Sequence, residues 1–449
     1  MNIQLIKILH LRKMVSSKEQ NSIYDIRIST VAPADISTKY GFQELSAIDL
    51  AMKLHYIRFV YYFKIPTFDG FTIIKIKETM CDWLNNASIP CGRFRRTDSG
   101  QPILKCNAAG VRIIEASCYL SLDEWLESKD DSRHKLLVPS NVIGPELSYS
   151  PLVMIQLTKF KCGATSVGMG WSHVLGDVFS AMGFIRLWSQ VIAGHYPDQP
   201  IIMAQPIIMT QPQNEVTNNP NPNPELLSIK RVGPVGDLWS TSSNSKMETF
   251  SIYISMNELT RFQTKICQDK AGLQIPQFEC ICVMIWHCLG KIRQGLGPQV
   301  VTVCKSDLRN RTHGIITNKN QTINVIKSDI PIVECTLMQL GSLMMNQVVD
   351  ERNKIEEAMK SDDMLSDFLI YGVNLTFIDL SDVLFYDIEV RGQKPVYVNC
   401  FMDNIDDKGV VLILPTPKGC SDGRIVSITL QENEMVNLKK VLKNDWCIA

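Results

Sequence analysis

The sequence lacks both long hydrophobic runs and an excess of charge of either sign. No apolar run approaches the roughly 18 residues that a membrane-spanning helix needs. Lys plus Arg total 46 and Asp plus Glu total 46, so the formal net charge is zero. A neutral chain creates no field that favours nucleic acid or an anionic membrane. We therefore expect no transmembrane span and no nucleic-acid partner.

The cysteines form neither a disulfide-rich pattern nor a common zinc motif. There are 14 of them, without any C-x-x-C pair, and most lie in apolar runs. We interpret them as reduced, buried side chains in a compartment that faces the cytosol. Cys280, Cys282, His287 and Cys288 lie close together, but their spacing fits no usual zinc site and residues 278–292 resemble a buried helix. We expect no metal site.

A clear secretion signal is also missing. Residues 1–14 are apolar but are interrupted by basic residues, and they contain no signal-peptide core or cleavage site. Two alternatives stay open: translation begins at Met14, or the segment is a short amphipathic anchor. We treat residues 1–22 as a loose N-terminal extension.

The rest of the chain divides at a stretch rich in proline and asparagine. Seven prolines between positions 197 and 224 exclude a continuous helix or central strand there. We place a linker at 196–246, between domains at 23–195 and 247–449, and expect Trp239 to anchor it. Both halves alternate strands with helices, which predicts an α/β protein of two similar layers that face each other.

One stretch of the first half carries the candidate chemistry. Residues 152–160 and 165–171 are predicted strands, and Gly168 in the second indicates that something packs close to its backbone. Residues 178–192 carry a helical stripe of apolar side chains. Further along, we expect a helix at 277–293 and a long amphipathic helix at 332–360.

His173 and Asp177 lie where the second strand turns into the helix. An imidazole titrates near neutral pH, so His173 could act as a general base on a hydroxyl or amine. Asp177 could orient the ring or turn away and hold the loop. The alternative is that His173 is a structural histidine, and the residues alone do not decide between these interpretations.

Several segments, in order, resemble the BAHD family of plant CoA-dependent acyltransferases. They are the early LSAID segment at 45–49, the CGRF segment at 91–94 with the residues that follow to 116, the stretch 156–188 with its His-x-x-x-Asp motif, and SDLRNR at 306–311. The similarity covers nearly the whole chain.

The resemblance implies a fold and a site. The fold would be two chloramphenicol acetyltransferase-like domains, joined by a long crossover loop, with the His-x-x-x-Asp motif in a channel between them. The co-substrate would be acyl-CoA, with no tightly bound cofactor and no metal. Arg309 is the candidate partner of Asp177, although a surface cation is the alternative for it.

Two positions depart from the family pattern. Val178 stands where the family usually has Gly. The family's second motif, DFGWGKP, is reduced at 387–395 to Asp387, Gly392 and the final Lys-Pro. In the family this loop supports the active site, so its loss argues against ordinary acyl transfer, while Asp387 and Gly392 remain candidate supporting residues.

Residues 173–181 and 230–239 are similar to the eceriferum and Glossy subgroup, in which the second motif is degenerate. This resemblance implies a role in very-long-chain fatty acid elongation for cuticular wax. The partner would be the elongase condensing enzyme, a ketoacyl-CoA synthase, at the cytosolic face of the endoplasmic reticulum or in the cytoplasm. The alternative is an active acyltransferase that uses an alcohol or amine acceptor, with His173 as general base.

Overall fold

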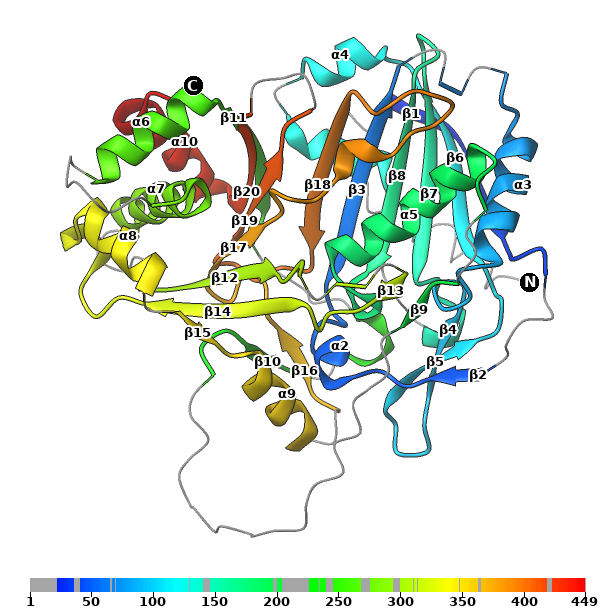
Figure 1. Cartoon of the computed structure of the whole chain (residues 1–449), viewed down its shortest axis with the longest axis horizontal. Helices are drawn as coiled ribbons and strands as arrows, with labels where there is room; N and C mark the ends of the chain where they lie inside the picture. Colours follow the sequence, from blue (N-terminus) through cyan, green and yellow to red (C-terminus); the bar gives the residue numbers. More distant parts are fainter. Residues whose placement is uncertain are drawn as a thin grey trace.

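The computed structural model describes most of the chain, and two β-sheets organise it (Figure 1). The described residues are 22–35, 41–64, 67–68, 70–128, 130–139, 146–196, 200–203, 226–233, 235–239, 245–267, 275–293, 299–309, 311–312, 314–346, 348–361, 365–417 and 422–448. All but the last residue of the expected N-terminal extension, and most of the expected linker, lie outside this set.

The first sheet has six strands in the order β1-β6-β7-β8-β3-β18. Their bounds are β1 Ile23–Val31, β3 Tyr56–Phe63, β6 Val111–Cys118, β7 Val153–Phe160, β8 Thr165–Ser172 and β18 Tyr397–Asp403. The strands expected at 152–160 and 165–171 are confirmed as β7 and β8, which pair antiparallel.

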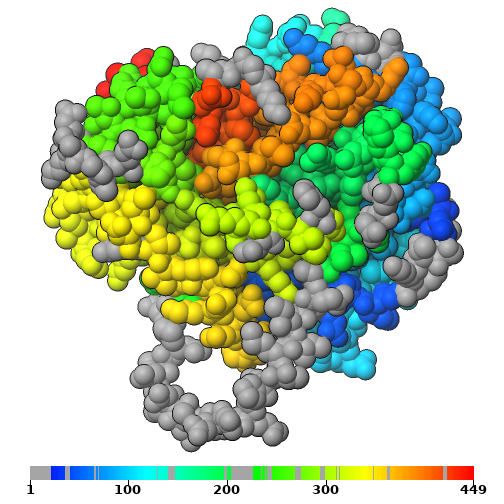
Figure 2. All heavy atoms as spheres, in the orientation of Figure 1, coloured from blue at the N-terminus to red at the C-terminus, as the bar shows by residue number. Residues whose placement is uncertain are grey.

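The edge strand β18 comes from the second half of the chain. It pairs antiparallel with β3 over seven residues, from Tyr397 opposite Tyr62 to Asp403 opposite Tyr56. Figure 2 shows orange atoms of this part of the chain packed against the blue and green atoms of the first half. The first sheet is therefore complete only when the second half of the chain is present.

The second sheet has seven strands in the order β11-β20-β19-β17-β12-β14-β15. Their bounds are β11 Met247–Ile254, β12 Val300–Ser306, β14 Gln321–Lys327, β15 Val349–Asp350, β17 Leu375–Asp379, β19 Val410–Pro415 and β20 Arg424–Gln431. The other described strands form three small sheets. One joins β2 Gly41–Gln43, β5 Pro102–Cys106 and β4 Arg93–Arg96. The second pairs β9 Ile202–Met203 with β13 Ile315–Ile316, and the third pairs β10 Lys230–Val232 with β16 Asp367–Leu369.

Helices flank the two sheets, and their apolar stripes form the cores (Figure 1). Those of the first half are α2 Ala47–Ala51, α3 Ile73–Leu84, α4 Leu122–Leu126 and α5 Val178–Ile192. Those of the second are α6 Met256–Cys267, α7 Gln277–Ile292, α8 Leu337–Asn346, α9 Arg352–Ser361 and α10 Glu432–Trp446. The helices expected at 178–192 and 277–293 are confirmed as α5 and α7.

The prediction of one long helix at 332–360 is wrong. The structure has two shorter helices there, α8 and α9, with the short strand β15 between them. β15 pairs with β14 and becomes the edge of the second sheet. The backbone hydrogen bonds of residues 349 and 350 therefore go to a neighbouring strand and not to a helical turn.

Two described parts of the predicted linker are held tightly. Trp239 is 1% exposed, and its carbonyl accepts a hydrogen bond from Asn404 Nδ2 at 3.1 Å. Glu351 accepts hydrogen bonds from the backbone N–H of Ser228 at 2.9 Å and from its hydroxyl at 2.7 Å. The expected anchoring role of Trp239 is confirmed, and Glu351 adds a second anchor on the other half.

Gly168 lies in β8 against the backbone of another segment, as the sequence indicated. A Cβ atom at this position would come within 2.0 Å of the Leu137 carbonyl oxygen. We expect Gly168→Ala to lower the free energy of unfolding by about 3 kcal/mol, because the backbone must shift to relieve the overlap. Urea denaturation would measure this change.

Gly183 in α5 provides the matched control, because nothing lies within 4 Å of a Cβ added there. Gly183→Ala should stabilise the protein by roughly 0.5–1 kcal/mol, since alanine loses less backbone freedom in a helix. Equal effects of the two substitutions would contradict the close contact at Gly168.

Candidate functional site

His173 follows the last residue of β8 and begins a short 3₁₀ turn. Its backbone N–H donates to the His55 carbonyl oxygen at 3.1 Å. Its carbonyl accepts from Asn318 Nδ2 at 2.9 Å, and the same amide nitrogen donates to Asp49 Oδ1 at 3.0 Å. Groups from both halves of the chain therefore fix the backbone of His173.

The imidazole of His173 is closed off by a tyrosine from the second half. Its Nε2 lies 2.9 Å from the Tyr371 hydroxyl, and the ring is 0% exposed. Gln321 Nε2 donates to the same hydroxyl at 2.7 Å. In the Nδ1–H tautomer of His173, the tyrosine hydroxyl, which already accepts from Gln321, donates its proton to Nε2. This contact occupies the lone pair that would accept a proton from a substrate.

Burial lowers the pKa of His173 to about 4. The ring is therefore neutral at physiological pH, which is the form that a general base requires. A neutral ring is equally what a buried histidine that accepts a tyrosine hydrogen bond requires. The protonation state agrees with both interpretations of His173, so the access to Nε2 has to distinguish them.

Asp177 holds the loop and does not touch the imidazole. One carboxylate oxygen accepts from the backbone N–H and the hydroxyl of Ser180, both at 3.0 Å, so Asp177 is the N-cap of α5. The other oxygen accepts from the Ser306 hydroxyl at 3.2 Å and from Arg311 Nη2. Of the two roles left open for Asp177, the structure supports the second.

The partner of Asp177 is Arg311 and not Arg309, so the expectation for Arg309 is wrong. Arg309 is exposed and is the last residue of an Asx turn. In this turn its backbone N–H donates to Asp307 Oδ1 at 3.0 Å. The Arg311 guanidinium instead lies 4.8 Å from the Phe179 ring centroid, beside the buried carboxylate.

The remnant of the second motif forms a tight turn on the α3 side of the molecule. Arg391 and Gly392 both have positive φ, 52° and 78°, and Val390 exchanges two backbone hydrogen bonds with Gln393. This is the geometry of a two-residue hairpin turn, for which Gly392 is well suited. The Arg391 guanidinium lies 5.3 Å from the ring centroid of Phe71.

Asp387 precedes this turn and ends a short 3₁₀ helix. Its Oδ1 lies 3.8 Å from Lys394 Nζ. Two of the residues that match the family's second motif therefore form a weak ion pair within the loop itself. Asp387 and Gly392 therefore shape this loop, and neither belongs to the hydrogen-bond set described above for His173.

One small cavity lies beside the site. A cavity of about 10 Å³ lies between the two sheets, and its lining includes Asp177, Val178, Gln321 and Tyr371. That volume holds at most about one water molecule. Val178, where the family usually has glycine, contributes its side chain to this wall.

No group of three or more His, Cys, Asp or Glu in the described part of the chain could hold a metal ion. Cys280 and Cys282 are buried in α7, as the sequence suggested. Burial raises the pKa of the Cys280 thiol to about 12, so it stays protonated and is a poor ligand.

Four residues that complete the site were not singled out from the sequence. They are Asn318, Gln321, Tyr371 and Arg311, all in the second half. Only Arg311 carried a signal, since it lies in the SDLRNR stretch beside Arg309. The others are single polar residues in loops or at the start of a strand, where spacing identifies no role.

Comparison with known proteins agrees with this architecture. A family model described as "Transferase family" matches residues 22–444. The chain is 35% identical to the protein ECERIFERUM 26 of Arabidopsis thaliana over 441 residues, which covers 98% of this chain and 99% of that protein.

Two solved structures have the same fold. Vinorine synthase aligns with a TM-score of 0.67 at 16% identity, over 92% of this chain and 96% of that one. The F. graminearum TRI101 protein, solved with coenzyme A and deoxynivalenol, aligns with a TM-score of 0.66 at 12% identity, over 91% and 98%. At these identities the likeness shows the fold alone.

Proposed function

The chain belongs to the Transferase (BAHD) family, and we propose that it acts in very-long-chain fatty acid elongation for cuticular wax as a partner of the elongase condensing enzyme. In this role the acyltransferase fold is used for binding and His173 is structural. The eceriferum relative and the degenerate second motif both support an elongation role over ordinary acyl transfer.

The observation that carries the proposal is the contact between Tyr371 and His173. Nε2 of His173 is hydrogen-bonded to the Tyr371 hydroxyl, the ring has no exposed surface, and a cavity that Tyr371 lines has room for about one water. A general base must come within hydrogen-bond reach of the substrate proton. For a thioester and an acceptor to meet at Nε2, Tyr371 would have to leave, which would also break its bond to Gln321.

A second candidate function is acyl transfer from acyl-CoA to an alcohol or amine. The neutral state of His173 is compatible with it, because the burial that lowers the pKa to about 4 keeps the base unprotonated. In that case acyl-CoA is a co-substrate and not a tightly bound cofactor. This function needs an opened form in which the Tyr371 hydroxyl has withdrawn from His173.

The proposed partner is a ketoacyl-CoA synthase, and the proposed location is the cytosolic face of the endoplasmic reticulum, reached through that partner. Among the described residues no helix is both long enough and apolar enough to cross a bilayer. Attachment to a membrane-bound condensing enzyme would supply the membrane contact that the proposed role requires.

Co-expression in yeast with a plant condensing enzyme tests the proposal. We expect longer fatty acids only when both proteins are present. With His173→Ala in place of the wild type, the products should be as long as those of the wild type. The reason is that a structural histidine contributes to stability and not to the chemistry. Fatty-acid methyl esters resolved by gas chromatography provide the measurement, with protein levels checked by immunoblot.

Tyr371→Phe is the matched variant, because it removes the hydroxyl on Nε2 and keeps the ring. The partner role predicts that it too leaves the chain lengths unchanged. Loss of the longest products in His173→Ala at normal protein level, while Tyr371→Phe retains or increases them, would instead identify His173 as a catalytic base.

A further inference from the structure

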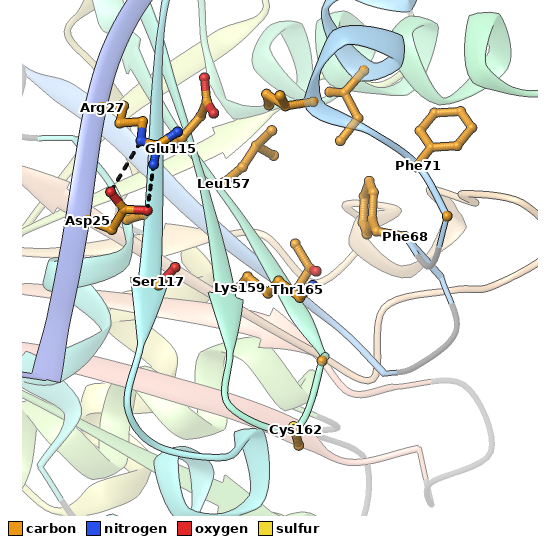
Figure 3. A pocket seen from close by; sticks show the side chains of 15 residues that line it. Asp25, Arg27, Phe68, Phe71, Glu115, Ser117, Leu157, Lys159, Cys162 and Thr165 are labelled. Carbon is orange, nitrogen blue, oxygen red and sulfur yellow. Dashed lines mark hydrogen bonds and ion pairs between the residues drawn. The ribbon is translucent and has the colours of Figure 1, made fainter.

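A groove lies on the first sheet at the end away from His173. Figure 3 shows it between the face of strands β1, β6, β7 and β8 and the segment that leads into α3. Its volume is about 490 Å³, which falls within the range of small-ligand sites. Thr165 begins β8 and His173 follows its end, so roughly 25 Å of strand separates the groove from the histidine.

A row of polar side chains forms one end of the groove floor. Ser117, Lys159 and Thr165 are direct neighbours in register on β6, β7 and β8. Adjacent strands lie about 4.8 Å apart, so a hydroxyl, an ammonium group and a second hydroxyl stand side by side. None of these three side chains has a hydrogen bond or ion pair with another described residue.

Apolar side chains form the next row and the facing wall. Leu157 lies two residues before Lys159 on the same face of β7. Across the hollow, Phe68 and Phe71 present their rings from the loop before α3 (Figure 3), and Ile73 and Ile76 continue this wall along the helix. The groove therefore has a polar end and an apolar body.

The charges that line the groove leave one cation without a described counter-ion. Arg27 donates two hydrogen bonds to the Asp25 carboxylate, both at 3.1 Å. Glu115 pairs with Lys77 at 2.6 Å. Within each pair the two charges balance. The positive charge of Lys159, the exposed side chain of β7, remains without a described counter-ion. The groove thus presents a net positive charge at its polar end.

We propose that this groove binds a long-chain fatty carboxylate. The carboxylate would lie on Lys159 and accept hydrogen bonds from the hydroxyls of Ser117 and Thr165, which are donors that suit an anion. The aliphatic chain would lie along Leu157 and the two phenylalanine rings. This site is distinct from the His173 site, and the inference stands whether or not His173 is catalytic.

The test is calorimetric titration of the purified full chain with dodecanoate, below its micelle concentration, and with dodecanol as the uncharged analogue. We expect dodecanoate to bind saturably, at least about tenfold more tightly than dodecanol. The reason is that only the carboxylate can form a charged hydrogen bond with Lys159. In Lys159→Gln the affinity for dodecanoate should fall about tenfold, to the level of the alcohol.

Lys161→Gln is the matched control. It removes the same charge two residues away, in the exposed turn after β7, and Lys161 does not line the groove. It should leave the affinity for dodecanoate unchanged. Thr165→Val, which keeps the shape of the side chain and removes its hydroxyl, should weaken binding several-fold.

Three outcomes would overturn the proposal. The first is the absence of saturable binding, and the second is an equal loss of affinity in Lys159→Gln and Lys161→Gln. The third is Lys159-dependent sedimentation with phosphatidylserine vesicles that free dodecanoate does not inhibit, since the groove would then recognise a membrane lipid. Both readouts are independent of the yeast elongation assay, so this inference and the proposed function can fail separately.

Discussion

The free energy of unfolding should fall steeply as the pH is lowered from about 6.5 towards 4. Three buried histidines cause this, because burial lowers their pKa values from 6.5 to about 3 or 4; they are His55, His134 and His173. In this window the unfolded chain binds protons that the folded chain does not. Stability is therefore present above pH 6.5 and is lost on acidification.

The size of the effect follows from linkage. Each histidine contributes about 1.4 kcal/mol per pH unit, so three give a limiting slope on the order of 4 kcal/mol per pH unit. Burial raises the pKa values of Asp49 and Asp379 above 3.8. These carboxyls protonate first in the folded state and offset part of the loss close to pH 4.

Urea denaturation at half-unit pH intervals between 4.5 and 7.5 measures this slope. His173→Gln should reduce it by about 1.4 kcal/mol per pH unit, because one titrating group is removed. A slope that His173→Gln does not alter would show that this ring titrates normally in the folded protein.

Arg311→Ala should destabilise the protein by about 3–5 kcal/mol. The Asp177 carboxylate is 2% exposed, and the substitution would leave its charge with only hydroxyl and backbone donors. Removing one partner of a buried ion pair is costly because the other charge stays desolvated. Thermal and urea unfolding at pH 7.5 would measure the loss.

Arg309→Ala is the control, since it removes the same charge two residues away from an exposed position. We expect it to change the free energy of unfolding by no more than about 0.5 kcal/mol. A larger effect for Arg309→Ala than for Arg311→Ala would contradict the ion pair with Asp177. Asp177→Asn in the Arg311→Ala background should recover part of the loss, because the unpaired charge is then absent.

Local patterns in the sequence predicted the elements around the site well. Alternation and turn residues gave β7 and β8, the apolar stripe gave α5, and a glycine within a strand indicated the close contact at Gly168. These features depend on neighbours along the chain. The fold as a whole was predicted by family resemblance and not by periodicity.

The failures have a common physical cause, which is that the deciding contacts are distant in the sequence. Two arginines two residues apart would share a face of an extended chain, so spacing could not choose between Arg309 and Arg311. The turn at Asp307 directs Arg309 to solvent. Similarly, the helical pattern of 332–360 carried no sign that residues 349 and 350 would pair with β14.

Tyr371 is the most consequential residue that the sequence did not reveal. It lies 198 positions after His173, in a loop without a motif. Its effect on His173 depends on how the two halves approach each other, which no local pattern encodes. The degenerate second motif pointed to altered chemistry, but not to the residue that closes the histidine off.

The pairing of β18, from the second half of the chain, with β3, from the first half, has a consequence for the protein during its synthesis. The ribosome completes β3 at residue 63 but does not complete its neighbour β18 until residue 403. At about 5–20 residues per second, this interval lasts roughly 20 to 70 seconds. Throughout it the nascent chain carries a strand rich in tyrosine and phenylalanine whose β18-facing edge is unpaired, a template for wrong pairing. Chaperone binding to the emerging chain would be most valuable in this interval.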